Sequence, residues 1–144
     1  MDFRDFAKLT KERARNLPEQ GHEVVKNVAK AYLVTAADIT PVDTGAAISN
    51  WQIGINASPS GVLPPHVPGK FRSTALENLN ATIRAGTSIV DSSKPRDVLH
   101  IVNNIHYIAD LNSGTSSQAP SGMTAIAELV ARRVPATAKV VNPR

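Results

Sequence analysis

Residues 123–134, MTAIAELVARRV, carry the strongest periodic pattern in the chain. Their apolar members recur at steps of three and four, at Met123, Ile126, Ala127, Val130, Ala131 and Val134. Because an α-helix turns once every 3.6 residues, this spacing predicts an amphipathic helix with a single apolar face. Pro135 lacks a backbone donor and clashes with the preceding turn, so it is expected to end this helix.

A second helical pattern lies near the amino end of the sequence. Apolar residues within 24–39 again recur at steps of three and four, and an earlier set runs from Phe3 to Leu17. Pro18 interrupts the two sets. The sequence therefore predicts either two helices, about 2–16 and 19–38, or one long kinked helix. The segment ends at Thr40-Pro41, because a residue before proline avoids the helical conformation.

Two short segments read as strands. Trp51, Ile53 and Ile55 alternate with Gln52, Gly54 and Asn56, which predicts a strand with one buried face. Val98–Val102 is apolar except for His100, which is typical of a central strand that is buried on both faces.

The segments between these strands predict a loop and a helix. Residues 57–69 hold four prolines and two glycines and are expected to form a long exposed loop. Thr74-Ala-Leu-Glu77 has the spacing of a capping box and opens a predicted helix over 75–85, with Gly86 as its stop. Shorter helical turns are expected at 46–49 and around 105–111, the latter closed by Gly114.

The 144 residues suffice for one domain with a modest core, and 42% of them are hydrophobic. We expect an α+β fold in which a long N-terminal helical segment and a C-terminal helix pack on a small, mostly antiparallel sheet. The single domain, 1–144, divides into an N-terminal helical segment (1–39), an α+β core (40–134) and a C-terminal tail (135–144).

The composition offers little chemistry. Cysteine is absent, and the four histidines, His22, His66, His100 and His106, show no metal-ligand spacing. Asp43 is expected to cap the turn that follows it rather than to act as an acid. No apolar run could span a bilayer, and the charged N-terminus does not resemble a secretory signal, so an intracellular soluble protein is expected. We predict no catalytic residue, cofactor or metal, and no enzyme activity.

Charge leaves one alternative open. The net charge is +4, and residues 128–144 hold four Lys/Arg against one acid. Such a tail can contact nucleic acid, which makes a small basic nucleic-acid-binding protein the alternative function. The same arginines can instead complement a helix C-terminus.

Three blocks of sequence point to a family. The first is Thr40-Pro-Val-Asp-Thr-Gly45 followed by Ser49-Asn50-Trp51. The second is Ile101-Val-Asn-Asn104 followed by Tyr107-Ile-Ala-Asp-Leu111 and Gly114, and the third is Ser117-Gln-Ala-Pro-Ser-Gly-Met123. In this order and spacing they resemble the minor tail, or tail-completion, proteins that join head and tail in tailed double-stranded DNA bacteriophages.

The resemblance implies a structural virion protein of the phage neck or tail, assembled in the host cytoplasm and located at the head–tail junction. It implies a ring of copies around the DNA channel, with six as the first expectation and twelve as the second. The implied neighbours are head-completion or adaptor proteins and tail-terminator or tail-tube proteins. DNA would pass through the lumen without sequence-specific binding, and no membrane is involved.

The residues that carry the resemblance are expected to maintain the fold. They are Pro41, Asp43, Thr44, Gly45, Trp51, Asn104, Tyr107, Gly114, Gln118, Ala119, Pro120, Gly122 and Met123. A further set in the 57–69 loop is expected to contact a neighbouring subunit and to be mobile in the free chain, since prolines preorganise an extended segment for docking. That set is Val62, Leu63, Pro64, Pro65 and Val67, and its alternative is a loop folded over its own sheet with Leu63 buried.

Overall fold

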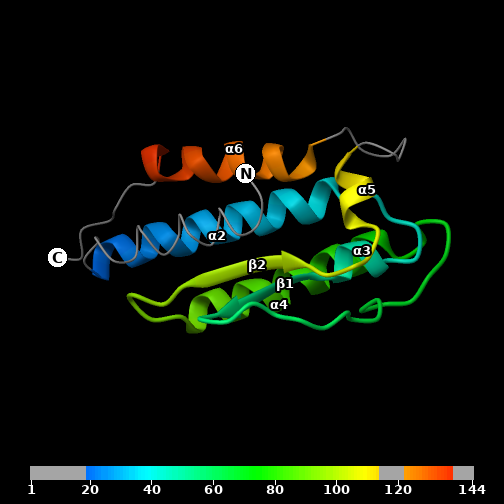
Figure 1. The fold of residues 1–144 in the computed structure, drawn as a ribbon, viewed down its shortest axis with the longest axis horizontal. Helices are drawn as coiled ribbons and strands as arrows, with labels where there is room; N and C mark the ends of the chain where they lie inside the picture. Colours follow the sequence, from blue (N-terminus) through cyan, green and yellow to red (C-terminus); the bar gives the residue numbers. More distant parts are fainter. Residues whose placement is uncertain (1–18, 114–121, 138–144) are drawn as a thin grey trace.

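A central helix organises the structure, a computed structural model that describes residues 19–113 and 122–137. Helix α2 (Glu19–Ile39) lies between α6 (Met123–Thr137) on one side and α4 (Ala75–Ser92) with a small sheet on the other (Figure 1). The predicted helices over 19–38 and 123–134 are therefore confirmed. The expected helix over 2–16 and the tail beyond residue 137 lie outside the described residues.

The sheet consists of two antiparallel strands, β1 (Trp51–Ile55) and β2 (Leu99–Asn103). Their register pairs Trp51 with Asn103, Ile53 with Ile101 and Ile55 with Leu99, so these residues share one face. That face lies toward the core, and Ile101 and Leu99 are completely buried. The α+β class is confirmed. β2 is not a central strand, however, because within the described residues it pairs with β1 alone and its remaining positions are half-buried.

Short side chains line the contact between α2 and α6. Ala29 and Ala36 on α2, and Ala127 and Ala131 on α6, are almost completely buried. Small residues at a helix contact let the two backbones approach closely. The longer residues Leu33 and Tyr32 extend the same core toward α4 and the sheet.

Helix α4 is longer than predicted. Its expected stop, Gly86, lies inside the helix, where a Cβ would come within 2.2 Å of Leu33 Cδ2. The helix continues to Ser92 because the next turn buries Val90, and this burial outweighs the roughly 1 kcal/mol that glycine costs inside a helix. Thr74 does precede the helix, but its hydroxyl donates to Val67 O (2.9 Å) and makes no capping bond, which corrects the predicted capping box.

Helix α6 also passes its predicted end, running through Pro135 to Thr137. Proline removes one hydrogen bond to the residue four positions earlier, and only two helical residues follow it, so the loss falls within the last turn. The short helices α3 (Ala46–Ser49) and α5 (Ile108–Asn112) lie where turns were expected. Residues 57–69 contain no helix or strand, as predicted.

Candidate assembly surface around the 40–45 turn

The turn over residues 40–45 joins α2 to α3 and depends on a glycine. Gly45 adopts φ 89°, a left-handed conformation that penalises any side chain. A Cβ at this position would also lie 2.3 Å from Asn78 Nδ2 on α4. The turn therefore requires glycine for two reasons, the left-handed backbone and the close approach to α4.

Thr40 brings the first and third sequence blocks together. Trp51 donates its indole N–H to Thr40 Oγ1 (2.8 Å), and the Thr40 hydroxyl donates to Ala36 O (2.6 Å). Met123 Sδ lies 3.6 Å from the same hydroxyl. All of these side chains are buried, so the motif residues Trp51 and Met123 are core residues that both contact the Thr40 hydroxyl.

The first and second blocks meet at a hollow of about 300 Å³ beside the turn. Pro41, Asp43 and Thr44 line one wall, and Tyr107 lines another with Leu111. Burial raises the pKa of the Tyr107 hydroxyl, and the nearby Asp43 carboxylate raises it further. The hollow therefore combines an anionic group with a half-buried phenol that stays neutral at neutral pH.

Contrary to the prediction, Asp43 does not cap the turn that follows it. Its Oδ1 accepts a hydrogen bond from Phe71 N (2.9 Å), and its carbonyl oxygen accepts one from Arg72 N (3.0 Å). Thr44 Oγ1 accepts the bond from Ala46 N (3.3 Å) instead. The Asp43 carboxylate therefore holds a segment that lies 28 residues later in the chain.

That segment is strained. Phe71 and Arg72 have φ values of 53° and 67°, a left-handed conformation that costs non-glycine residues roughly 1–2 kcal/mol each. The two hydrogen bonds that Asp43 accepts, together with the bond that Ser73 N donates to Lys70 O (3.0 Å), hold this turn. Phe71 is 89% exposed, the highest value among the large hydrophobic residues of the described part of the chain. No glycine or asparagine marked this turn in the sequence, so it was not predicted.

Two asparagine side chains fix the course of the 57–69 loop. Leu63 donates its N–H to Asn50 Oδ1 (2.7 Å) and accepts from Asn50 Nδ2 (2.8 Å). Val67 is held in the same way, by Asn78 Oδ1 (2.9 Å) and Asn78 Nδ2 (2.8 Å). His66 N adds a bond to Ser49 Oγ (3.0 Å). Each asparagine side-chain amide thus bonds both the N–H and the C=O of one loop residue, as the backbone of a neighbouring strand would.

These asparagine hydrogen bonds, here called the loop clamps, argue against the expectation that the loop is mobile in the free chain. The alternative of a loop folded over its own body describes its course, with one correction: Leu63 keeps 38% of its surface exposed. Val62 is 59% exposed, Pro64 is exposed, and Pro65 and Val67 are half-buried. The backbone is fastened while aliphatic groups face outward, as a preformed contact surface requires.

The clamping asparagines were missed by sequence reasoning, although a signal existed. Buried positions of α4 recur every four residues, at Asn78, Thr82, Gly86 and Val90. A polar residue on a buried helical stripe must be hydrogen-bonded, which points to a structural role for Asn78. Among the second-block residues, Asn104 Nδ2 also holds the loop, donating to Pro59 O (2.9 Å) and Gly61 O (3.1 Å).

The third block is only partly described. Its residues Gln118, Ala119 and Pro120 lie outside the described residues, as does Gly114 at the end of the second block. Gly122 has φ 78° and donates its N–H to Asn112 O (2.7 Å), which leads the chain into α6. Met123 is completely buried.

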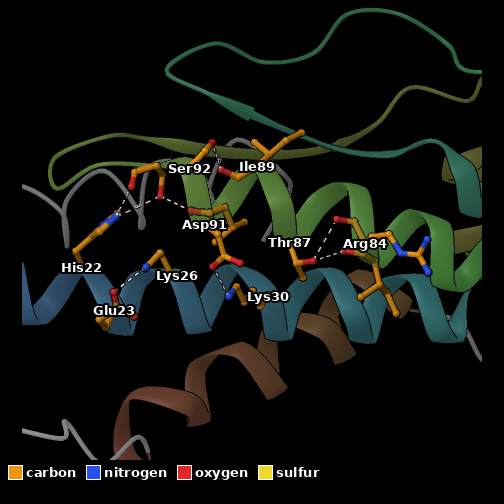
Figure 2. Close-up of polar contacts among 12 residues, drawn as sticks. His22, Glu23, Lys26, Lys30, Arg84, Thr87, Ile89, Asp91 and Ser92 are labelled. Atoms are coloured by element: carbon orange, nitrogen blue, oxygen red, sulfur yellow. Dashed lines mark hydrogen bonds and ion pairs between the residues drawn. The ribbon is translucent and has the colours of Figure 1, made fainter.

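A polar cluster between α2 and the end of α4 resembles a catalytic pair only superficially (Figure 2). His22 Nε2 lies 3.1 Å from Ser93 O and 3.3 Å from Ser93 Oγ. A nitrogen that donates to the carbonyl cannot accept the hydroxyl proton, and Ser93 Oγ donates to Val90 O (2.6 Å). Lys30 lowers the pKa of Asp91 through a hydrogen bond of 2.6 Å. The cluster therefore joins two helices and shows no activated nucleophile.

Within residues 19–113 and 122–137, no group of three or more His, Asp or Glu side chains is placed to hold a metal ion. In the same part of the chain, no helix is long and apolar enough to cross a membrane. Fold and site together define a small α+β protein with hollows and exposed apolar groups around one turn. Comparison with family models, curated protein sequences and solved structures finds no match to the chain.

Proposed function

We propose that the chain is a structural protein of the neck of a tailed double-stranded DNA bacteriophage, where copies form a ring around the DNA channel. One observation carries the proposal: residues from all three family-like blocks gather around the 40–45 turn. Thr40 contacts Trp51 and Met123, and Pro41, Asp43 and Thr44 line a hollow with Tyr107. If the three blocks mark a common fold and a common contact surface in the family, they should lie close together in the structure, as they do here.

The surface suits assembly better than catalysis. Its features are a fastened loop with outward aliphatic groups, an exposed aromatic ring and shallow hollows. Protein interfaces are built from apolar anchors surrounded by polar groups, and they need no activated side chain. A closed ring follows when each copy offers one surface to the next by rotation. We therefore propose no enzyme activity and no cofactor.

The proposed partners are copies of the chain, six by first expectation and twelve by second. Head-completion or adaptor proteins would lie on one side, and tail-terminator or tail-tube proteins on the other. The proposed location is the head–tail junction of the virion. The 57–69 loop is the proposed contact between subunits, through Val62, Leu63, Pro64, Pro65 and Val67.

Two measurements test this function. Native mass spectrometry of the purified chain should show a closed oligomer, and cryo-electron microscopy of particles that contain the chain should place it at the head–tail junction. Purified particles without the chain, or with the chain only elsewhere, would refute the proposal. For the loop contact, Val62→Asp should prevent ring formation, whereas Leu129→Asp, at an equally exposed position on α6, should not.

Nucleic-acid binding is the competing outcome of these tests. Arg132 is ion-paired with Glu128 (2.7 Å), which reduces its availability to phosphates. A chain that binds duplex DNA with an affinity falling steeply as salt rises, and that forms no ring, would favour the basic nucleic-acid-binding alternative.

A further inference from the structure

We propose that the chain self-associates through Phe71, whose ring enters a groove beside the 40–45 turn of a second copy. The proposal concerns the free chain in solution and does not depend on the phage neck. It rests on a knob and a groove that occur on the same molecule, close to each other.

The knob is the Phe71 side chain on its strained turn. Asp43 fixes both Phe71 N (2.9 Å) and Arg72 N (3.0 Å), so the turn is braced by the same segment that lines the groove. Phe71 is 89% exposed, although burial of an aromatic ring removes roughly 150–250 Å² from water. Strained backbone persists where its surroundings hold it, and such sites concentrate at ligand and partner contacts. Here the strain projects an aromatic ring into solvent.

The groove has a volume of about 410 Å³ and lies between the end of α2 and the start of α4. Ile39, Pro41 and Leu79 contribute apolar walls, and Leu76, 64% exposed, stands at its edge. Grooves of this size that are lined mainly by apolar side chains accept an aromatic group. Phe71 is not among the residues that line this groove, although its neighbour Arg72 is, and its own ring stays exposed.

Charge selects a second copy as the occupant. Asp38 and Arg72 both border the groove, and neither forms an ion pair with another of the described residues. Because Arg72 adjoins the knob, docking brings it to the partner's groove, where a second Asp38 lies. Knob and groove lie close together, so two copies related by a two-fold axis can exchange Phe71 side chains reciprocally, with both charges matched.

The contact should be weak. Two rings and their surroundings bury less than the roughly 1,200 Å² that the smallest stable interfaces reach. We therefore expect dissociation constants at or above about the micromolar range. Sedimentation equilibrium over a wide concentration range should show a monomer–dimer equilibrium for the native chain, alongside any larger ring.

The main variant is Phe71→Gly, because it separates docking from folding. Glycine relieves the left-handed strain, so the melting temperature should not fall, while dimerisation should weaken at least about tenfold, as for loss of an interface anchor. Leu129→Ala on α6 is the matched control for loss of an exposed apolar group and should leave dimerisation unchanged. A Phe71→Gly chain that associates like the native one would overturn the proposal.

The absence of cysteine allows a direct test of proximity. Phe71→Cys and Asp38→Cys chains are mixed and oxidised, and a mixed disulfide should form much faster than between Phe71→Cys and Leu129→Cys chains. Equal rates in the two mixtures would reject the knob-in-groove geometry even if the chain dimerises. A dimer with the expected cross-link but no copies in phage particles would sustain this inference and refute the proposed function. Phage particles that contain a ring of this chain, without a Phe71-dependent dimer in solution, would support the proposed function and refute this inference.

Discussion

The indole N–H of Trp51 donates a 2.8 Å hydrogen bond to the hydroxyl of Thr40, and both residues are buried. Trp51 begins β1, while Thr40 follows the last residue of α2, so the bond joins the sheet to the central helix. The Thr40 hydroxyl in turn donates a hydrogen bond to Ala36 O (2.6 Å). One hydroxyl thus satisfies the buried indole and ties the first residues of the turn to the helix.

Replacing Thr40 with valine should destabilise the protein by about 1–3 kcal/mol, because it leaves the Trp51 donor buried without an acceptor. Urea unfolding followed by circular dichroism measures this loss. Thr35→Val is the control, since Thr35 lies one turn earlier, on α2, and takes part in none of these bonds. In a double-mutant cycle with Trp51→Phe, a coupling energy near zero would contradict the assigned role of the bond.

Gly45→Ala should destabilise the fold by about 2–4 kcal/mol. The new Cβ meets the left-handed penalty and a contact of 2.3 Å with Asn78 Nδ2, which is held by its bonds to the loop. Gly61→Ala is the matched control, because a Cβ there has no neighbour within 4 Å. The control should change the free energy of unfolding by less than about 1 kcal/mol. Equal effects at the two glycines would refute this account of Gly45.

The loop clamps predict a specific pattern of hydrogen exchange. In the isolated chain, the amides of Leu63 and Val67 should be protected, since each donates to a buried or half-buried side-chain oxygen. Asn50→Ala should accelerate exchange at Leu63, and Asn78→Ala should accelerate exchange at Val67. Each variant is the control for the other. Fast exchange at both amides in the native chain would restore the idea of a mobile loop.

Local patterns predicted the helices and strands because each pattern reflects one buried face. The three-and-four spacing of α2 and α6 and the alternation of β1 required no knowledge of a partner. The ends of α4 and α6 were wrong for the opposite reason. Gly86 and Pro135 are breakers by local preference, and only tertiary contacts, such as the burial of Val90, show that the helix continues past Gly86.

The candidate surface was predictable in its members but not in its bonds. The three sequence blocks named Asp43, Trp51 and Tyr107, yet the partner of Asp43 is a backbone amide 28 residues away. The left-handed turn at Phe71 and Arg72 has no compositional mark, because neither residue favours that conformation. Bonds between distant segments depend on the whole fold, and one sequence does not display them.

The last prediction concerns alkaline pH. Burial raises the pKa of the Tyr32 hydroxyl strongly, and the Glu128 carboxylate raises it further. In the unfolded chain a tyrosine ionises near pH 10. Above that pH the unfolded state releases a proton that the folded state retains, so the free energy of unfolding falls as pH rises. The loss should reach about 1.4 kcal/mol by pH 11, since one pKa unit corresponds to 1.36 kcal/mol.

Tyr32→Phe should flatten this decline in urea titrations between pH 9 and 11. Tyr107→Phe should flatten it less, because Tyr107 is only half-buried. Lysines ionise in the same range in all three chains, so the difference between them isolates the tyrosine. An identical decline in the native and Tyr32→Phe chains would show that Tyr32 ionises in the folded state, which its nearly complete burial argues against.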